Sequence, residues 1–487
     1  MNISKVFKTD RDCDVKTIMY DSRKKCSDSI FFAMKGRIND GHDFIDQAID
    51  NGAICIVYTD EINTKRDNVS YVKVSDATDA YVSFCNAFYD YPTDKMNTIG
   101  VTGTNGKTTI AWIIRSIISH FNKCGYIGTR GYSLDGTIEE SSLNLTTPKS
   151  DEFFRICKEM VDYGCETLVL EASSEGLLTH RLDQVKFKTA IFNNLSIEHI
   201  DVHGDMESYF KAKCILFDML EDDGIAITNI DDEYGKRIVG YRDVRTVTYA
   251  IDNEADYMAK NIVLHPDSSS FDLIHDNKTY HIDTNMIARF NIYNMLAIVA
   301  ALNENGYPIE DILEYLHEVE LCDGRVEVVK AGQDFNVVVD YAFTTNSFDK
   351  VFSYAESITD KNNKIIAVFG AAGDRDPQRR PGTSKVADER ADLVILTHDD
   401  PATEDMMTIL KEMQTYFKRL SPEIIFNREE AIEEAVRVAE KGDTILLLGK
   451  GDDHFFIYPE GHRFYCSDKV AVTNAINKLK RNVNSND

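Results

Sequence analysis

The chain has 487 residues, of which 28% are charged and 43% hydrophobic, and its formal net charge is −27. This length predicts about three domains, each able to bury a core. So acidic a surface would repel nucleic acid and anionic membranes, which excludes both as partners. The first residues carry no apolar signal segment, and no apolar run is long enough to cross a bilayer. Ten cysteines without a CxxC pair indicate free thiols in a reducing cytosol, so we expect a cytoplasmic protein.

Short β-rich runs alternate with helical stretches from the start of the chain, which indicates α/β domains. Residues 29–34 (SIFFAM) and 53–58 (AICIVY) are predicted strands. Residues 89–94 (YDYPTD) have the composition of a linker, so the first domain is predicted to span 1–95.

The second domain is predicted to span 96–322. It begins with a strand at 98–102 (TIGVT), a glycine-rich turn and a helix over 109–121 (TIAWIIRSIISHF). Further strands are predicted in this domain, at 167–170, 189–192 and 224–228.

The third domain is predicted to span 323–487, after a boundary near residues 321–323. Its predicted strands lie at 336–340, 365–369, 393–396 and 444–448. Each strand ends in polar or glycine-rich residues, and doubly wound sheets bind their ligands at such strand ends.

The strongest local motif is the segment 100–109 (GVTGTNGKTT), between a predicted strand and a predicted helix. Its glycines allow the backbone to wrap around phosphates, and the helix N-terminus favours negative charge. Lys107 is expected to reach the terminal phosphates, and the Thr108 hydroxyl to bind Mg²⁺. The strict pattern G-x4-GK[ST] fails because Val101 stands five positions before Gly106. A chance glycine-rich turn is the alternative, but the position between strand and helix favours a nucleotide site.

The TGTNGKTT core of this segment resembles the phosphate loop of the Mur ligase family. The resemblance continues along nearly the whole chain, at 170–174 (LEASS), 194–204 (NLSIEHIDVHG), 209–213 (YFKAK), 289–294 (RFNIYN), 324–327 (GRVE), 340–342 (DYA), 373–376 (GDRD) and 449–451 (GKG). These motifs in order are far more specific than any one alone. They imply an α/β protein with an N-terminal uridine-binding domain, a central P-loop ATPase-like domain with a mostly parallel sheet, and a C-terminal Rossmann-like domain.

The resemblance implies two Mg²⁺ sites, held by Thr108, Glu171, His199 and Lys213, with Lys213 carbamylated by CO₂. Taken alone, Glu171 would more often be a turn residue or helix cap. A lone histidine is usually a structural hydrogen-bonding group. A lysine in a helix such as the one predicted here is ordinarily solvated. Only the phosphate loop and the resemblance raise these residues to candidate ligands.

The implied reaction is ATP-driven amide formation through an acyl phosphate, in which the protein positions the reactants and neutralises charge. The implied catalytic residues are Lys107, Lys213, His199, Glu171 and Arg325. The residues implied to bind ATP are Gly103, Thr104, Asn105, Gly106, Lys107, Thr108, Thr109, Asn294, Arg325 and Asp340. Among them, Asp340 fits a ribose ligand and Asn294 a contact on the adenine side.

The N-terminal segments 21–23 (DSR), 31–36 (FFAMKG) and 40–45 (DGHDFI) resemble the uridine-binding domain of the family member that adds a diamino acid. As isolated segments they would equally fit turns or caps. The implied partners are a UDP-muramoyl dipeptide and a free amino acid, and we expect a monomer. The residues implied to hold the UDP-muramoyl substrate are Ser22, Thr146, Thr147, Ser173 and Arg181.

The added amino acid is expected to be recognised by the third domain. In the branch of the family that uses meso-diaminopimelate, the arginine of a D-N-P-R motif grips the distal carboxylate. Here residues 399–402 are DDPA, with Ala402 in place of that arginine. This favours L-lysine or L-ornithine, unless Arg375 or Arg428 binds the distal carboxylate instead. The residues implied to bind the amino acid are Arg375, Asp399, Asp400, Gly449 and Asp453.

Several positions depart from the family pattern without touching the phosphate, metal or lysine motifs. Phe343, Thr345 and Asn346 replace a histidine, a proline and an aspartate, Glu198 replaces an aspartate, Ala288 a glycine and Glu175 a histidine. Two other functions stay open: a Mur-like ligase acting on another UDP-sugar or small acid, and a non-catalytic nucleotide-binding protein. Retention of Lys107, Thr108, Glu171, His199 and Lys213 disfavours the second.

Overall fold

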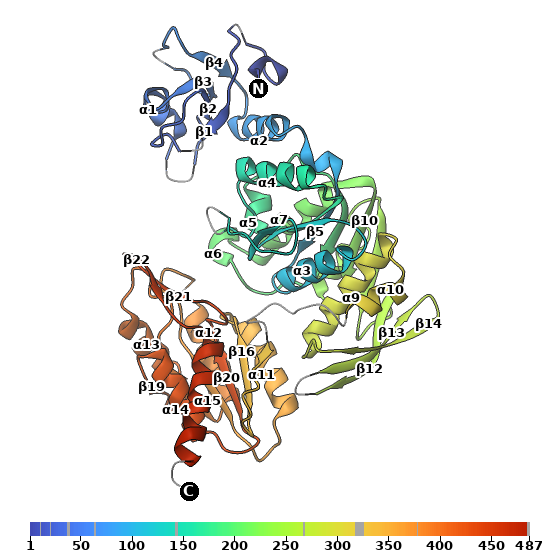
Figure 1. Cartoon of the computed structure of the whole chain (residues 1–487), viewed down its shortest axis with the longest axis vertical. Helices are drawn as coiled ribbons and strands as arrows, with labels where there is room; N and C mark the ends of the chain where they lie inside the picture. Colours follow the sequence, from blue (N-terminus) through green and yellow to red (C-terminus); the bar gives the residue numbers. More distant parts are fainter. Residues whose placement is uncertain are drawn as a thin grey trace.

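A computed structural model of the chain shows three α/β bodies arranged along its long axis, as Figure 1 shows. The structure describes all residues except 10, 20, 37–38, 63–64, 142–144, 266–267, 317–325, 377 and 485–487, and the side chains of 201 and 482–484. The predicted fold class is confirmed. The predicted second boundary lies outside the described residues, and the three domain ranges remain a proposal.

The N-terminal body is built on a parallel sheet with the order β1-β2-β3-β4. Its elements are η1 (Ile3–Lys5), β1 (Thr17–Met19), β2 (Ser29–Phe32), η2 (Gly41–Phe44), α1 (Ile45–Asp50), β3 (Ala53–Tyr58), β4 (Ser70–Lys73) and α2 (Ala77–Phe88). The predicted linker contains the short helix η3 (Pro92–Lys95), which follows Asp90 and Tyr91 in left-handed backbone conformations.

The central body contains a ten-stranded sheet with the order β14-β13-β12-β11-β10-β9-β5-β8-β6-β7. Pairing is parallel from β6 through β12, and β7, β13 and β14 add antiparallel strands at the two edges. Its strands are β5 (Asn97–Thr102), β6 (Cys124–Gly128), β7 (Gly131–Ser133), β8 (Thr167–Glu171), β9 (Phe187–Phe192), β10 (Leu220–Asn229), β11 (Arg245–Ala250), β12 (Tyr257–Leu264), β13 (Ser269–His275) and β14 (Lys278–Thr284). Its helices are α3 (Lys107–Ile118), α4 (Ser150–Tyr163), α5 (Ser174–Leu178), α6 (Ile200–His203), α7 (Met206–Asp218), α8 (Glu233–Lys236), α9 (Arg289–Glu304) and α10 (Ile309–Leu316).

The C-terminal body has a six-stranded sheet with the order β15-β16-β20-β17-β18-β19 and a hairpin, β21-β22. Its strands are β15 (Glu327–Val328), β16 (Asn336–Asp340), β17 (Ile365–Phe369), β18 (Leu393–Leu396), β19 (Glu423–Ile424), β20 (Thr444–Leu448), β21 (Phe455–Tyr458) and β22 (Gly461–Phe464). Its helices are α11 (Thr345–Ile358), α12 (Arg379–Arg390), α13 (Met406–Gln414), α14 (Arg428–Val438) and α15 (Asp468–Asn484). Strands β3, β16, β17, β18 and β20 have the bounds predicted from their apolar runs.

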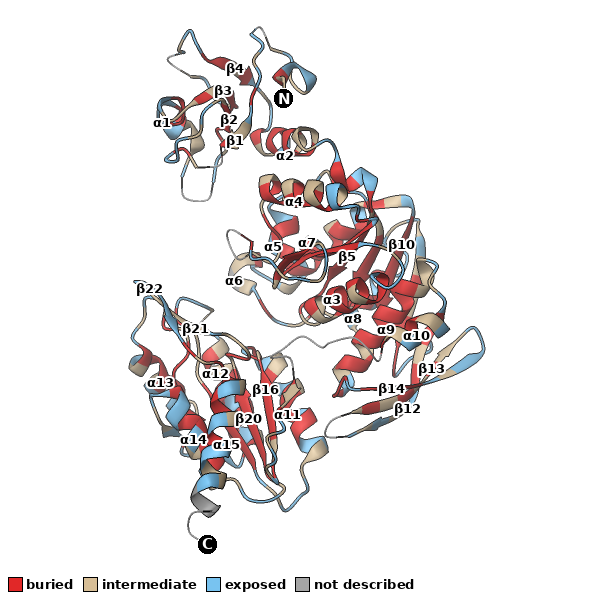
Figure 2. Cartoon of the chain, in the orientation of Figure 1, coloured by how far each residue is buried: buried red, intermediate tan, exposed pale blue. Residues whose placement is uncertain are grey.

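The central strands of both large sheets are buried on both faces, which Figure 2 shows as red strands between helices with pale outer faces. In the sequence these strands are continuous apolar runs, because helices cover both faces of the sheet. Among the described residues, no helix combines the length and apolarity needed to span a membrane.

Strand register brings the motifs together. In the central sheet Val101 pairs with Glu171 and Thr102 with Phe192, so the phosphate loop, Glu171 and the segment after β9 emerge at one edge. In the C-terminal sheet Asp340 pairs with Leu448, so Asp340 and Gly449 also share an edge. Parallel sheets bind ligands at the carboxyl ends of their strands, and both edges contribute to the cavity described below.

Candidate active site

A cavity of about 1010 Å³ lies between the central and C-terminal bodies. Sixteen of the predicted site residues line it: Thr104, Asn105, Gly106, Lys107, Thr108, Thr109, Thr146, Glu171, His199, Asn294, Asp340, Arg375, Asp399, Asp400, Gly449 and Asp453. Arg325 lies outside the described residues. The remaining predicted residues, Ser22, Gly103, Thr147, Ser173, Arg181 and Lys213, are not among those that line this cavity.

The phosphate loop needs its glycines for both conformation and space. Gly103 and Gly106 have φ values of +147° and +89°. A Cβ at Gly106 would lie 2.3 Å from Asn193 Nδ2 and 2.4 Å from Asn294 Oδ1. Helix α3 begins at Lys107, earlier than predicted, so the loop ends directly on a helix N-terminus. The free N–H groups there favour an anion.

Lys107 is held by the loop itself. Its Nζ donates to the carbonyl oxygens of Gly103 and Thr104, both at 2.9 Å. The ammonium is therefore placed over the loop, where phosphates would bind, before any ligand arrives.

Glu171 is fully buried at the end of β8 and receives four hydrogen bonds. The Thr108 hydroxyl donates to Oε2 at 3.0 Å, and Tyr126 donates to Oε1 at 2.6 Å. The amide and hydroxyl of Thr129 complete the set, both at 3.0 Å. A glutamate that served only as a turn residue or helix cap would not receive four hydrogen bonds on its carboxylate. The Thr108 and Glu171 oxygens form a pair that suits an oxygen-seeking cation such as Mg²⁺.

Lys213 is 1% exposed, so the alternative of a solvated helix residue is wrong. Its Nζ donates to the Gly103 carbonyl at 2.9 Å and lies 4.5 Å from the centre of the Tyr209 ring. Burial, followed by the charge of Lys107, holds the pKa of Lys213 well below its usual range, although Glu198 opposes the shift. Burial therefore favours the neutral form of this amine.

His199 lies beside the phosphate loop in a left-handed conformation, with φ of +56°. Its Nε2 is 3.7 Å from Glu198 Oε1. Removal of water from the imidazole lowers the pKa of His199, and Arg379, Lys107 and Lys213 add to the shift against Glu198. The neutral imidazole is the form that binds metals.

A network of asparagines supports the loop from below, and sequence reasoning missed part of it. Asn193 Nδ2 donates to the Asn105 carbonyl at 2.9 Å and to Asn294 Oδ1 at 2.8 Å. Asn194 Oδ1 accepts from the Asn105 amide at 2.9 Å. The only signal for Asn193 was its place after an apolar strand. Asn294, whose Nδ2 donates to Asn291 Oδ1 at 2.8 Å, therefore supports the loop through Asn193 and also lines the cavity.

Asp340 is almost buried, and each of its carboxylate oxygens accepts a backbone amide. Oδ2 accepts from Val326 and Oδ1 from Ala342, both at 2.7 Å. The residue therefore fixes the entry of the chain into the C-terminal body. Its predicted role as a ribose ligand stays a prediction.

Three predicted substrate residues gather behind the phosphate loop. The hydroxyls of Thr147 and Ser173 are 2.9 Å apart. Arg181 donates to the Thr147 carbonyl and to Glu175 Oε1, both at 2.9 Å. Glu175, where the family usually has a histidine, thus orients Arg181. Ser22 lies in the N-terminal body, where its hydroxyl bonds to Gln47 at 2.8 Å.

The predicted amino-acid site contains a lysine that sequence reasoning did not single out. Lys450 is 1% exposed, and its Nζ lies 2.8 Å from Asp400 Oδ1 and 3.1 Å from Asp453 Oδ2. Burial disfavours its charge, but Asp399, Asp453 and Asp400 outweigh burial and raise the pKa of Lys450. Burial also raises the pKa of Asp399 and of Asp453. Three carboxylates thus face one cation, which leaves the site acidic.

Ala402 does not line the cavity, although Asp399 and Asp400 do. Its amide donates to Ile457 O at 3.1 Å, and its φ is +49°. Arg428 cannot supply the predicted grip, because it is 2% exposed and bonds to Asp468 at 2.7 and 2.6 Å. Of the two arginines predicted for this role, Arg375 is the one that lines the cavity.

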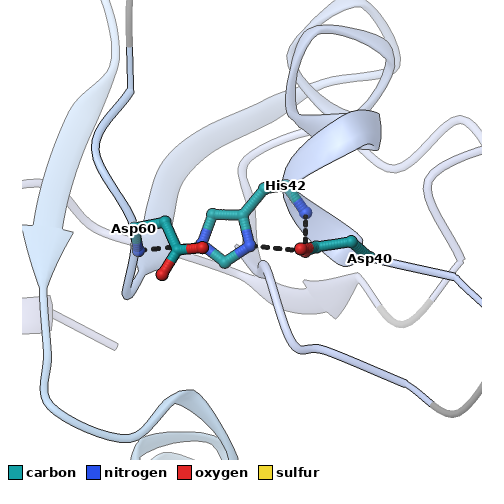
Figure 3. A group of neighbouring side chains, drawn as sticks. All are labelled: Asp40, His42 and Asp60. Atoms are coloured by element: carbon teal, nitrogen blue, oxygen red, sulfur yellow. Dashed lines mark hydrogen bonds and ion pairs between the residues drawn. The ribbon is translucent and has the colours of Figure 1, made fainter.

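Asp40, His42 and Asp60 form a separate group in the N-terminal body, drawn in Figure 3. Both ring nitrogens of His42 are already used. Nδ1 is 2.6 Å from Asp40 Oδ1, while Nε2 accepts from the amides of Thr59 and Asp60, each at 3.2 Å. No imidazole lone pair is left for a metal, so this histidine fixes the loops of the predicted uridine-binding domain.

Three family models match the chain. The Mur ligase middle domain matches residues 101–302, the Mur ligase glutamate ligase domain 324–451, and the Mur ligase family catalytic domain 14–89. The UDP-N-acetylmuramoyl-L-alanyl-D-glutamate--2,6-diaminopimelate ligase 1 of Clostridium acetobutylicum is 35% identical over 474 residues, covering 96% of each chain. The corresponding ligase of Clostridioides difficile is 35% identical, covering 97% of each. The chain belongs to the Mur ligase family.

Solved structures agree with this assignment. A UDP-N-acetylmuramoyl-L-alanyl-D-glutamate--2,6-diaminopimelate ligase superposes on this Mur ligase with a TM-score of 0.70 and 25% identity over 99% of each chain. The MurF ligase from Thermotoga maritima, in complex with ADP, shares the fold with a TM-score of 0.63 and 18% identity, covering 96% of this chain and 99% of that one. This Mur ligase is an ATP-dependent enzyme that forms amide bonds, which sets aside a non-catalytic nucleotide-binding protein.

Proposed function

We propose that this enzyme joins a free diamino acid to UDP-N-acetylmuramoyl-L-alanyl-D-glutamate in peptidoglycan precursor synthesis, as a cytoplasmic monomer. The observation that carries the proposal is one cavity with a phosphate loop on its central wall and an acidic pocket on its C-terminal wall. The similar enzymes named above, which add 2,6-diaminopimelate to this dipeptide, support it.

The first half of the reaction uses the central wall. The substrate carboxylate attacks the γ-phosphorus of ATP, and the bond to the bridging oxygen breaks, leaving its electron pair on ADP. An acyl phosphate forms. Lys107 neutralises charge on the phosphates, while Arg181, oriented by Glu175, is proposed to position the muramoyl peptide.

The second half uses the C-terminal wall. The α-amine of the incoming amino acid attacks the acyl carbon, phosphate leaves with the bonding electron pair, and the amine releases a proton. Asp399, Asp400 and Asp453 are proposed to hold the diamino acid through its distal ammonium group, since Lys450 offsets only part of their charge.

The residues present fit two Mg²⁺ ions. Thr108 and Glu171 would hold one through oxygens that are now 3.0 Å apart. His199 and Lys213 would hold the second, with Lys213 converted to a carbamate. A neutral buried amine is the form that adds CO₂, and this supports the modification. The ions would supply positive charge at the transferring phosphoryl group.

We propose further that L-lysine or L-ornithine is preferred to meso-diaminopimelate. All three carry a distal ammonium, which an acidic pocket attracts. Only meso-diaminopimelate brings a second carboxylate beside it, which Asp399, Asp400 and Asp453 would repel. The similar enzymes are named for 2,6-diaminopimelate, and Arg375 is a cavity-lining arginine that could contact its second carboxylate.

The test is a competition assay. The full chain is incubated with ATP, Mg²⁺, the UDP-muramoyl dipeptide and equal concentrations of the three amino acids, and products are separated by mass. Formation of none of the three products would contradict the proposed function. Consumption of meso-diaminopimelate first would contradict only the preference.

A further inference from the structure

Arg379 crosses from the C-terminal body into the central site. It begins helix α12, and its Nη2 lies 3.7 Å from Oε1 of Glu198, the residue before His199. The arginine side chain is 20% exposed and that of Glu198 is 8% exposed. The pair therefore joins two bodies across the cavity, which both Arg379 and His199 line.

The hydrogen-bonding capacity of Arg379 is not filled by this contact. Its Nε is buried and has no hydrogen-bond partner among the described residues. A distance of 3.7 Å to Glu198 is too long for a hydrogen bond. The guanidinium is instead oriented by stacking over the Phe343 ring, at 4.7 Å from its centre. A buried donor without a partner costs free energy, which an incoming anion would recover.

Two other arginines of helix α12 have structural roles, and their hydrogen bonds differ from those of Arg379. Arg380 donates to Glu404 and Glu412 at 2.7 Å each. Arg390 donates to Glu356 at 2.7 Å and to Asp349 at 2.6 Å. Carboxylates accept hydrogen bonds from both of these guanidinium groups. Arg379 instead lines the cavity, and its Nε has no hydrogen-bond partner among the described residues.

Two cations from different bodies meet at one cavity of a strongly acidic chain. The net charge is −27, yet Lys107 of the central body and Arg379 of the C-terminal body line one cavity. Cations gathered from two bodies around a phosphate loop indicate an anion that both bodies contact.

We propose that Arg379 binds the γ-phosphoryl group of ATP and stabilises its negative charge during transfer. This deepens the proposed function and rests on it. As the carboxylate oxygen bonds to the γ-phosphorus and the electron pair of the broken bond passes to ADP, Arg379 donates N–H groups to the phosphoryl oxygens. Lys107 supplies charge from the central body and Arg379 from the C-terminal body, so transfer requires both bodies to be in place.

The experiment compares two nucleotides that differ in the γ-phosphoryl group. Calorimetry measures binding of ADP and of the β,γ-imido analogue of ATP, both with Mg²⁺, to the full chain and its variants. In Arg379→Gln, affinity for the analogue is expected to fall about tenfold while affinity for ADP is unchanged. Arg379→Lys is expected to keep part of the affinity. Lys385→Gln is the matched control, since Lys385 is an exposed residue of α12 that pairs with Glu389.

Equal losses for both nucleotides would overturn the proposal, because they would indicate a structural role for Arg379. Unchanged affinity for both would also overturn it. Unchanged ADP binding serves in addition as evidence that the variant is folded. No acceptor is present in this measurement, so failure of the enzyme to ligate the proposed substrates would contradict the proposed function without affecting the result.

Discussion

The two walls of the cavity differ in how their chemistry is built. On the central wall, Lys107 and Thr108 stand in one strand–turn–helix segment, and the Thr108 hydroxyl meets Glu171 from a neighbouring strand. On the C-terminal wall, Asp400 and Asp453 are brought together by Lys450. A phosphate site can thus be built largely from one local segment, whereas the charge of a specificity pocket is a sum over distant residues.

The largest expected effect is on the central wall. Lys107→Ala is expected to lower kcat by about 10³-fold, because the ammonium stabilises charge that develops on the transferring phosphoryl group. Phosphate release at saturating ATP measures it, and thermal unfolding should be little changed. Near wild-type turnover would remove Lys107 from the phosphate site.

Substitution of Lys213 tests whether the central wall needs a carbamylated lysine for activity. Lys213→Ala should lose about 10²-fold in kcat and recover part of it with short-chain carboxylates that refill the anionic position. The control is Lys211→Ala, an exposed lysine of the same helix. Intact-mass and structural measurements that find an unmodified amine with nucleotide and Mg²⁺ bound would argue against the carbamate.

The C-terminal wall can be altered through Ala402. Ala402 lies outside the cavity lining but only two residues after Asp400, so we expect the longer side chain of Ala402→Arg to reach the pocket. Its guanidinium should then receive the second carboxylate and shift the preference toward meso-diaminopimelate by about tenfold. Ala402→Gln provides similar length without charge. The ratio of kcat/KM values for meso-diaminopimelate and L-lysine is the measurement. An unchanged ratio in Ala402→Arg would place this loop outside the specificity pocket.

The smallest effect concerns Ala288, which lines the cavity where the family usually has glycine. Its φ of +74° and ψ of 146° are a conformation that is costly for any residue with a Cβ. Ala288→Gly is expected to stabilise the fold by about 1 kcal/mol. Ala288 directly precedes helix α9, and Ala300 lies in the interior of that helix. Ala300→Gly should instead destabilise the fold by about 1 kcal/mol or more. Denaturant titration distinguishes them, and destabilisation by both would contradict the strain at Ala288.

Much of the fold followed from local patterns. Strands such as β16 and β20 were predicted with their observed bounds, because helices cover both faces and leave an uninterrupted apolar run. The phosphate loop was predictable for a related reason: its glycines, lysine and helix start are adjacent in sequence. Helix α3 nevertheless begins at Lys107 rather than Thr109, since the loop glycine at 106 passes directly into the helix.

The three-domain α/β architecture, the phosphate loop and the order of the family motifs could all be predicted before folding was considered. Four features appear only in the folded chain: Lys213 is buried, Lys450 offsets the acidic pocket, Arg428 is bound to Asp468, and Arg379 reaches Glu198. Backbone conformation and strand burial depend on neighbouring residues, but the charge state of a side chain depends on what packs around it, and here those partners come from other elements and from another domain.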